Sequence, residues 1–194
     1  MKDNIKIEIN YMIRCHILPV TRRKVNLPWL SEELSVLSVA PMEIFASKIV
    51  ALLNRTAPRD LYDIHNLLEL GLFDESEQDM LKKCVVFYFC IGSEIVHKEF
   101  TFESLDKMPQ NKIKTDLLPV LRFGAYFDLK PAREKVTDYL KELLLLTPQE
   151  KEFIECFGMG EYKPELIFEG DMLNNVSAHP MAIWKCNKTK ENLS

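Results

Sequence analysis

The chain has 194 residues, enough for one domain with a sizeable core, or for one domain and a small appendage. Its net charge is −4 with a pI near 5.7, so a nucleic-acid partner would need a local basic patch. Five cysteines without any C-x-x-C pair argue against a disulfide framework or a zinc site. No unbroken apolar run is long enough to cross a membrane, and the start lacks a signal-peptide pattern, so we expect a cytoplasmic protein.

The first forty residues carry the β-structure that the sequence predicts. Isoleucines alternate with polar residues in IKIEI, which predicts a half-buried strand at about 5–14. A basic connection follows at 19–28, and the β-branched stretch 34–40 predicts a second short strand. Two strands do not form a stable sheet unaided. We therefore expect either further strands hidden in the sequence or a sheet completed by something absent from this chain.

Apolar residues recur with helical spacing from residue 41 onward. The predicted helix at 75–93 is apolar almost all round in its second half, which places it at the centre of a bundle. The fold class is therefore α+β and predominantly helical, with a β edge in 1–40, a helical domain in 41–186 and a disordered tail at 187–194. The main predicted helices span 41–55, 58–73, 75–93, 130–146 and 147–158.

Two cations on the first predicted helix are candidates for binding phosphate. At 100° per residue, Lys48, Ala51 and Arg55 fall on one stripe of the helix. Lys48 and Arg55 then lie roughly 10 Å apart along the axis, with a small residue between them. Two cations arranged in this way could grip a phosphate chain. The alternative is an ordinary solvated stripe on the helix surface.

The second predicted helix adds two carboxylates close to these cations. Its apolar spacing places Asp60 at the edge of the core, where a carboxylate needs a partner. Lys48 or Arg55 on the preceding helix is the expected partner. Arg59 and Asp63 are spaced as an i,i+4 ion pair, and the helix dipole favours both carboxylates in the first turn.

Two other charged features have a functional and a structural interpretation. Glu8 lies on the polar face of the predicted strand, where a carboxylate could hold a divalent metal or could simply face solvent. The densest basic cluster is TRRK at 21–24, with Arg14 nearby. It could contact an RNA backbone, or it could be a solvated loop.

The stretch 41–73 resembles the second half of the nucleotidyltransferase toxins of the AbiEii/AbiGii family. In that family, an E-x-x-x-A-x-K-x-x-A-L helix is followed by an R-D-x-x-D helix. The matching residues here are Glu43, Lys48, Arg59, Asp60 and Asp63. The strand IKIEI and the ending up to Cys186 also resemble the family, so the resemblance spans most of the chain.

The resemblance implies a polymerase-β-like nucleotidyltransferase core followed by a helical domain, with this chain covering the later part. It implies transfer of a nucleotide from a nucleoside triphosphate to an RNA acceptor, tRNA, with Mg²⁺ as the cofactor. Lys48 would bind the triphosphate, Asp60 would orient Lys48 or serve the catalytic step, and Glu8 would lie near the metal-binding carboxylates. The supporting nucleotide-binding residues would be Arg55, Arg59 and Asp63.

The sequence departs from the family at the front end. The family has a Gly-Gly or Gly-Ser helix start and then a D-x-D on a strand. Here the pair Gly92–Ser93 ends an apolar helix, and no D-x-D exists. We therefore expect a C-terminal portion, from a split, late-starting or degenerate gene, that is weakly active or inactive alone. The alternative is a non-catalytic module that binds an antitoxin or a separately encoded N-terminal half.

Overall fold

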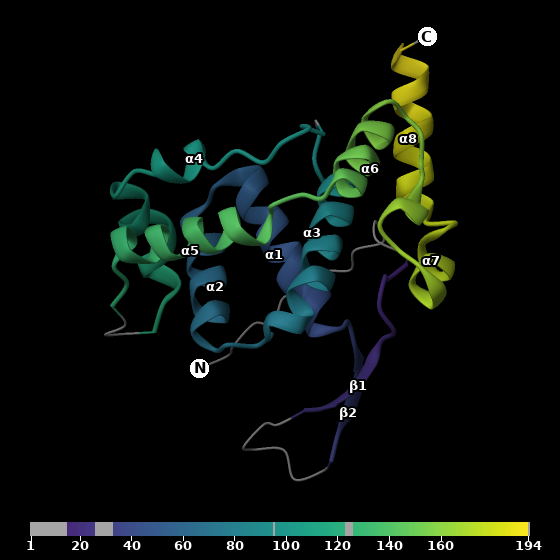
Figure 1. Cartoon of the computed structure of the whole chain (residues 1–194). Coiled ribbons are helices and arrows are strands. Elements are labelled where there is room, and N and C mark those ends of the chain that lie inside the picture. The colour runs from purple at the N-terminus through teal and green to yellow at the C-terminus, as the bar shows by residue number, and fades with distance from the viewer. Residues whose placement is uncertain (1–14, 26–32, 95, 123–125, 194) are drawn as a thin grey trace.

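A computed structural model describes residues 15–25, 33–94, 96–122 and 126–193 of the chain. It shows a small antiparallel sheet followed by a body of helices (Figure 1). The predicted α+β, predominantly helical fold class is confirmed. The predicted strand at 5–14 and its residue Glu8 lie outside the described residues. Within the described ranges, no helix is both long and apolar enough to cross a membrane.

The sheet is a two-stranded ribbon of β1 (Thr21–Lys24) and β2 (Ser35–Ser38), with Arg22 opposite Leu37. β2 confirms the predicted strand at 34–40. The prediction that TRRK belongs to a connection was wrong, because these residues form β1. The alternating apolar pattern that identifies a half-buried strand is absent here, since the ribbon buries neither face in the helical body. In Figure 1 the ribbon projects from one end of that body.

The helices follow the predicted order. Prolines in the first turns of α1 and α2 and a Thr147/Glu150 capping box on α6 mark three of their starts. The elements after the ribbon are α1 (Pro41–Arg55), α2 (Pro58–Glu69), η1 (Glu75–Glu77), α3 (Gln78–Gly92), α4 (Glu103–Asp106), η2 (Ile113–Leu117), η3 (Leu118–Val120), α5 (Leu129–Leu143), α6 (Pro148–Gly158), η4 (Pro164–Leu166), α7 (Gly170–Val176) and α8 (Pro180–Leu193).

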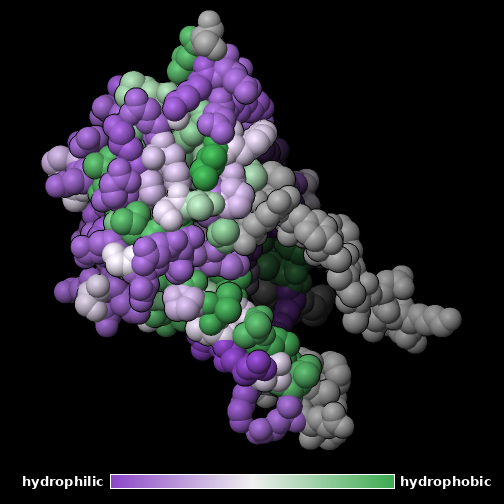
Figure 2. Space-filling model, turned by 90° about the vertical axis from the view of Figure 1, so that its right-hand side faces the viewer, coloured by the Kyte–Doolittle hydropathy of each residue, from purple (hydrophilic) through white to green (hydrophobic). Residues whose placement is uncertain are grey.

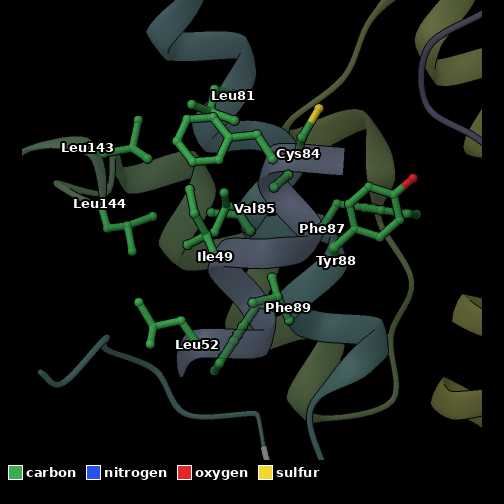
Figure 3. Close-up of a cluster of buried hydrophobic side chains, with 14 of the residues drawn as sticks. Ile49, Leu52, Leu81, Cys84, Val85, Phe87, Tyr88, Phe89, Leu143 and Leu144 are labelled. Carbon is green, nitrogen blue, oxygen red and sulfur yellow. The ribbon is translucent and has the colours of Figure 1, made fainter. Parts of the chain in front are cut away.

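Helix α3 lies at the centre of the body, as its apolar sequence predicts. Its residues 84–91 are all buried, and they pack against α1 and α6. Figure 3 shows Ile49 and Leu52 of α1 meeting Val85 and Phe89 of α3 in this core. This packing fixes α1, which therefore presents its remaining side as a rigid surface.

The prediction of a disordered tail at 187–194 differs from the structure, in which α8 continues to Leu193. Lys185 of α8 explains why the helix is held in place. Its ammonium donates hydrogen bonds to the carbonyl oxygens of Cys90 (2.7 Å) and Ser93, at the C-terminal end of α3. A cation there satisfies the free carbonyls and complements the helix dipole. The following turns of α8 extend a helix that is already docked.

The corner between α1 and α2 positions the charged residues for which the sequence predicts a site. Thr56 ends α1 with φ 49°, a left-handed conformation that is rare for a β-branched residue. Its N–H donates to the carbonyl of Leu52 at 2.9 Å, and Pro58 starts α2 two residues later. This tight corner brings the last turn of α1 beside the first turn of α2.

Candidate functional site

Arg55 and Asp60 form a two-point ion pair across the α1–α2 corner. Arg55 Nε donates to Asp60 Oδ2 at 2.8 Å, and Nη2 donates to Oδ1 at 2.7 Å. Asp60 is 2% exposed, as its predicted position at the core edge requires, whereas the Arg55 side chain is 66% exposed. The hydrogen bond to Asp60 and its charge raise the pKa of Arg55. The pair therefore satisfies a buried carboxylate and leaves much of the guanidinium accessible.

Lys48 pairs with Asp63 further from the corner, because Lys48 lies about two turns before Arg55 on α1 and Asp63 lies about one turn after Asp60 on α2. Lys48 Nζ lies 2.7 Å from Asp63 Oδ2, and both side chains are accessible, at 41% and 37%. The predicted Arg59–Asp63 pair was wrong. Arg59 Nε instead donates to the carbonyl oxygen of Asp116 in η2 at 2.5 Å. The i,i+4 rule considers one helix alone, whereas here η2 and α1 supply the partners of both residues.

The two ion pairs differ in how readily a ligand could replace them. An exposed pair such as Lys48–Asp63 contributes about 0–1 kcal/mol, because water and salt screen it. Breaking the Arg55–Asp60 pair would leave a buried carboxylate without a partner, which costs several times more. Lys48 is therefore the exchangeable cation of the corner and Arg55 is the fixed one. Both lie on the accessible stripe of α1, separated by the half-buried Ala51.

Glu43 is a structural residue of the site for which the sequence analysis gave no role. It is 2% exposed and accepts hydrogen bonds from the N–H groups of Ile17 (2.9 Å) and Leu18 (3.3 Å) and from the Tyr88 hydroxyl. Burial, and then the bond to Glu43, raises the pKa of Tyr88. Glu43 thus ties the segment before β1 to α1 and α3. Its place on the apolar side of α1 is the one sequence signal of this burial.

The carboxylates of the corner are paired with cations and are not grouped around a metal position. Within the described ranges, no group of three or more Asp, Glu, His or Cys side chains is close enough to hold a metal ion. Both oxygens of Asp60 are engaged by Arg55, and Asp63 faces Lys48. Glu8, the predicted metal ligand, lies outside the described residues. The corner is therefore a surface where cations and carboxylates pair with each other.

The fold and the corner define a predominantly helical α+β protein with two accessible cations on one helix face. The chain belongs to the AbiEii family: the family model for the nucleotidyl transferase AbiEii toxin of type IV toxin–antitoxin systems matches residues 2–153. This match covers both strands, the α1–α2 corner and the central helix α3. No curated protein and no solved structure matches the chain.

Proposed function

We propose that the α1–α2 corner binds the phosphates of a nucleoside triphosphate in a nucleotidyltransferase toxin that modifies an RNA, with tRNA as the acceptor. The family supports the class of reaction. The observation that carries the proposal is the arrangement of Lys48 and Arg55, two accessible cations on one face of α1 with a small residue between them. Phosphate oxygens accept hydrogen bonds from both types of side chain.

The geometry gives each residue of the corner a separate role in this proposal. A phosphate group would replace Asp63 as the partner of Lys48, because the side chains of both residues are accessible to solvent. Arg55 uses two of its five N–H donors on Asp60, and the other three remain for phosphate. Asp60 is then the residue that holds Arg55, which replaces the expectation that it orients Lys48. Arg59, held by Asp116, would add positive charge at the edge.

The transfer step requires carboxylates that the described residues do not supply. Phosphoryl transfer depends on metal ions and charges positioned around the reacting phosphorus. We propose that Mg²⁺ accompanies the nucleotide and that its carboxylate ligands come from outside the described residues, with Glu8 and a second polypeptide as the candidates. The purified chain alone is then weakly active or inactive, and we place its action in the cytoplasm.

The test combines nucleotide binding with transfer. Purified chain is mixed with radiolabelled nucleoside triphosphates, Mg²⁺ and bulk tRNA, and bound nucleotide and labelled tRNA are counted. We expect micromolar-to-millimolar nucleotide binding that Lys48→Ala abolishes and that Lys98→Ala, an exposed control paired with Glu155, leaves unchanged. Strong transfer by the chain alone would contradict the proposed need for further carboxylates. Equal binding by both variants would contradict the proposed site.

The second candidate function is a non-catalytic module that binds an antitoxin or another partner protein. The exposed β1–β2 ribbon favours it, because the ribbon does not pack on the helical body. The two functions are separable, since the ribbon and the α1–α2 corner use different residues. Substitution of Lys48 would leave a pure binding module unaffected.

A further inference from the structure

The β1–β2 ribbon exposes apolar side chains that a strand of a folded protein normally buries. Leu34, Val36 and Leu37 are all exposed, and Leu37 keeps 66% of its surface accessible. Opposite residues of an antiparallel pair share a face, so Leu37 lies beside Arg22 on one face and Val36 beside Arg23 on the other. The projection at the bottom of Figure 2 carries hydrophobic residues next to hydrophilic ones.

No described residue outside β2 pairs with the backbone groups along the outer edge of β1. The Val25 N–H donates to the carbonyl of Leu34 at 2.8 Å, which makes these two residues a hydrogen-bonded pair of the ladder. Such pairs alternate with non-bonded pairs along an antiparallel ladder. The N–H and C=O groups of Arg22 and Lys24 therefore point away from β2, and those of Arg23 point toward it. A strand that pairs with β1 would bond to Arg22 and Lys24.

The ribbon is held in a fixed direction although it projects from the body. Ile17, just before β1, is fully buried, with its N–H bonded to Glu43 and its carbonyl accepting from Asn175 Nδ2 at 3.1 Å. β2 continues into α1 through the buried Ala40. Both ends of the ribbon are thus anchored to the helical body, and a preorganised arm loses little entropy on binding.

We propose that the β1 edge binds a strand of a partner protein that carries carboxylates among aliphatic side chains. The free groups of Arg22 and Lys24 supply main-chain hydrogen bonds, as in other cases of strand addition. The side chains of Arg22, Arg23 and Lys24 pair with the carboxylates, and Lys24 exchanges its exposed pair with Glu33 (2.8 Å) for the partner's carboxylate. Val36 and Leu37 pack against the aliphatic residues. This inference rests on the ribbon alone and holds whether or not the α1–α2 corner binds nucleotide.

Charge favours a partner protein over the other possible occupants. The chain's own residues 1–14 contain three cations and two carboxylates, so their net charge has the same sign as that of β1 and an acidic strand complements β1 better. A second copy paired edge to edge through β1 would bring like cations together. A nucleic acid would neutralise the cations and leave the aliphatic side chains uncovered. An acidic, aliphatic strand complements both sets of side chains.

The test uses the full chain and two synthetic ten-residue peptides as probes, one alternating valine with glutamate and one alternating valine with lysine. Binding is followed by fluorescence anisotropy, and amide exchange is read by NMR. We expect the glutamate peptide to bind about tenfold more tightly than the lysine peptide. It should protect the Arg22 and Lys24 amides from exchange. The triple variant Arg22→Glu/Arg23→Glu/Lys24→Glu should reverse the preference.

Control substitutions separate this surface from general charge. Lys112→Glu/Lys114→Glu/Arg122→Glu makes the same change in net charge on exposed residues far along the chain, and should leave the preference unchanged. Equal binding of both peptides, or binding without protection of Arg22 and Lys24, overturns the proposal. It is also overturned by three findings that name another occupant: self-association through the ribbon, protection that depends on residues 1–14, or tRNA binding that the triple variant abolishes and Leu37→Ser does not affect.

Discussion

Asp63→Asn should increase the affinity of the chain for a triphosphate. The substitution removes the carboxylate that holds Lys48 Nζ at 2.7 Å and keeps the shape of the side chain. An exposed pair of this kind contributes about 0.2–1 kcal/mol. A triphosphate that no longer has to replace Asp63 gains about that amount, which corresponds to an increase in affinity of about 1.4- to 5-fold. The gain should shrink at high salt, because salt screens accessible charges.

The assay is a titration of fluorescent ATP against wild type, Asp63→Asn and Asp138→Asn at low and high salt. Asp138 is exposed on α5 and controls for the change in net charge. Thermal unfolding of each variant checks that the fold is intact. Unchanged or weaker ATP binding by a folded Asp63→Asn variant would refute the idea that Asp63 and phosphate compete for Lys48.

Four further substitutions test the packing of the corner and of the buried core. Arg55→Met should lower the free energy of unfolding by about 3 kcal/mol, because the buried Asp60 loses its partner, and Asp60→Asn should lower it by less. Urea titration measures both values. Equal losses would contradict the fixed role of Arg55. In the same assay, Glu43→Ala should lower the free energy of unfolding by about 3 kcal/mol, because it leaves buried hydrogen-bond donors unpaired. A loss below about 1 kcal/mol would show that Glu43 does not hold the segment before β1. His179 is fully buried, and burial lowers its pKa below the usual 6.5. As the pH falls, this histidine is therefore protonated in the unfolded chain before it is protonated in the folded chain. Stability should therefore decline as the pH falls through 6.5, and His179→Asn, which can still accept from the Ala182 N–H, should flatten that decline; an unchanged pH profile would exclude His179 as its source.

The helices were predictable because their sequence signals are local. Apolar spacing and N-terminal prolines identified α1 and α2, and the all-round apolar character of α3 placed it at the centre. The strand β1 was missed because the ribbon buries neither face, so its sequence lacks the alternation of apolar and polar residues that identifies a half-buried strand. The tail was missed because the contact of Lys185 with α3 holds α8 from another part of the chain.

The candidate site was predictable in its residues and less so in its pairing. The core-edge position of Asp60 followed from helix spacing, and its partner came from the two cations that the spacing offered. Spacing within one helix also suggested that Arg59 pairs with Asp63. Arg59 instead donates a hydrogen bond to the carbonyl of Asp116, which is 57 residues away in the sequence. Glu43 shows the same limit, because its donors on Ile17 and Leu18 lie about 25 residues earlier. Contacts between residues so far apart in the sequence arise from tertiary packing, which the local spacing of apolar residues does not encode.

We propose that the α1–α2 corner binds triphosphate through Lys48. The most direct measurement is an NMR titration of the ¹⁵N-labelled lysine side chains with ATP, resolving Lys48 and the exposed control Lys98. We predict that the Lys48 Nζ resonance shifts and saturates with ATP while the Lys98 resonance stays in place. A Lys48 resonance that does not move at saturating ATP, or that moves no further than that of Lys98, would contradict it.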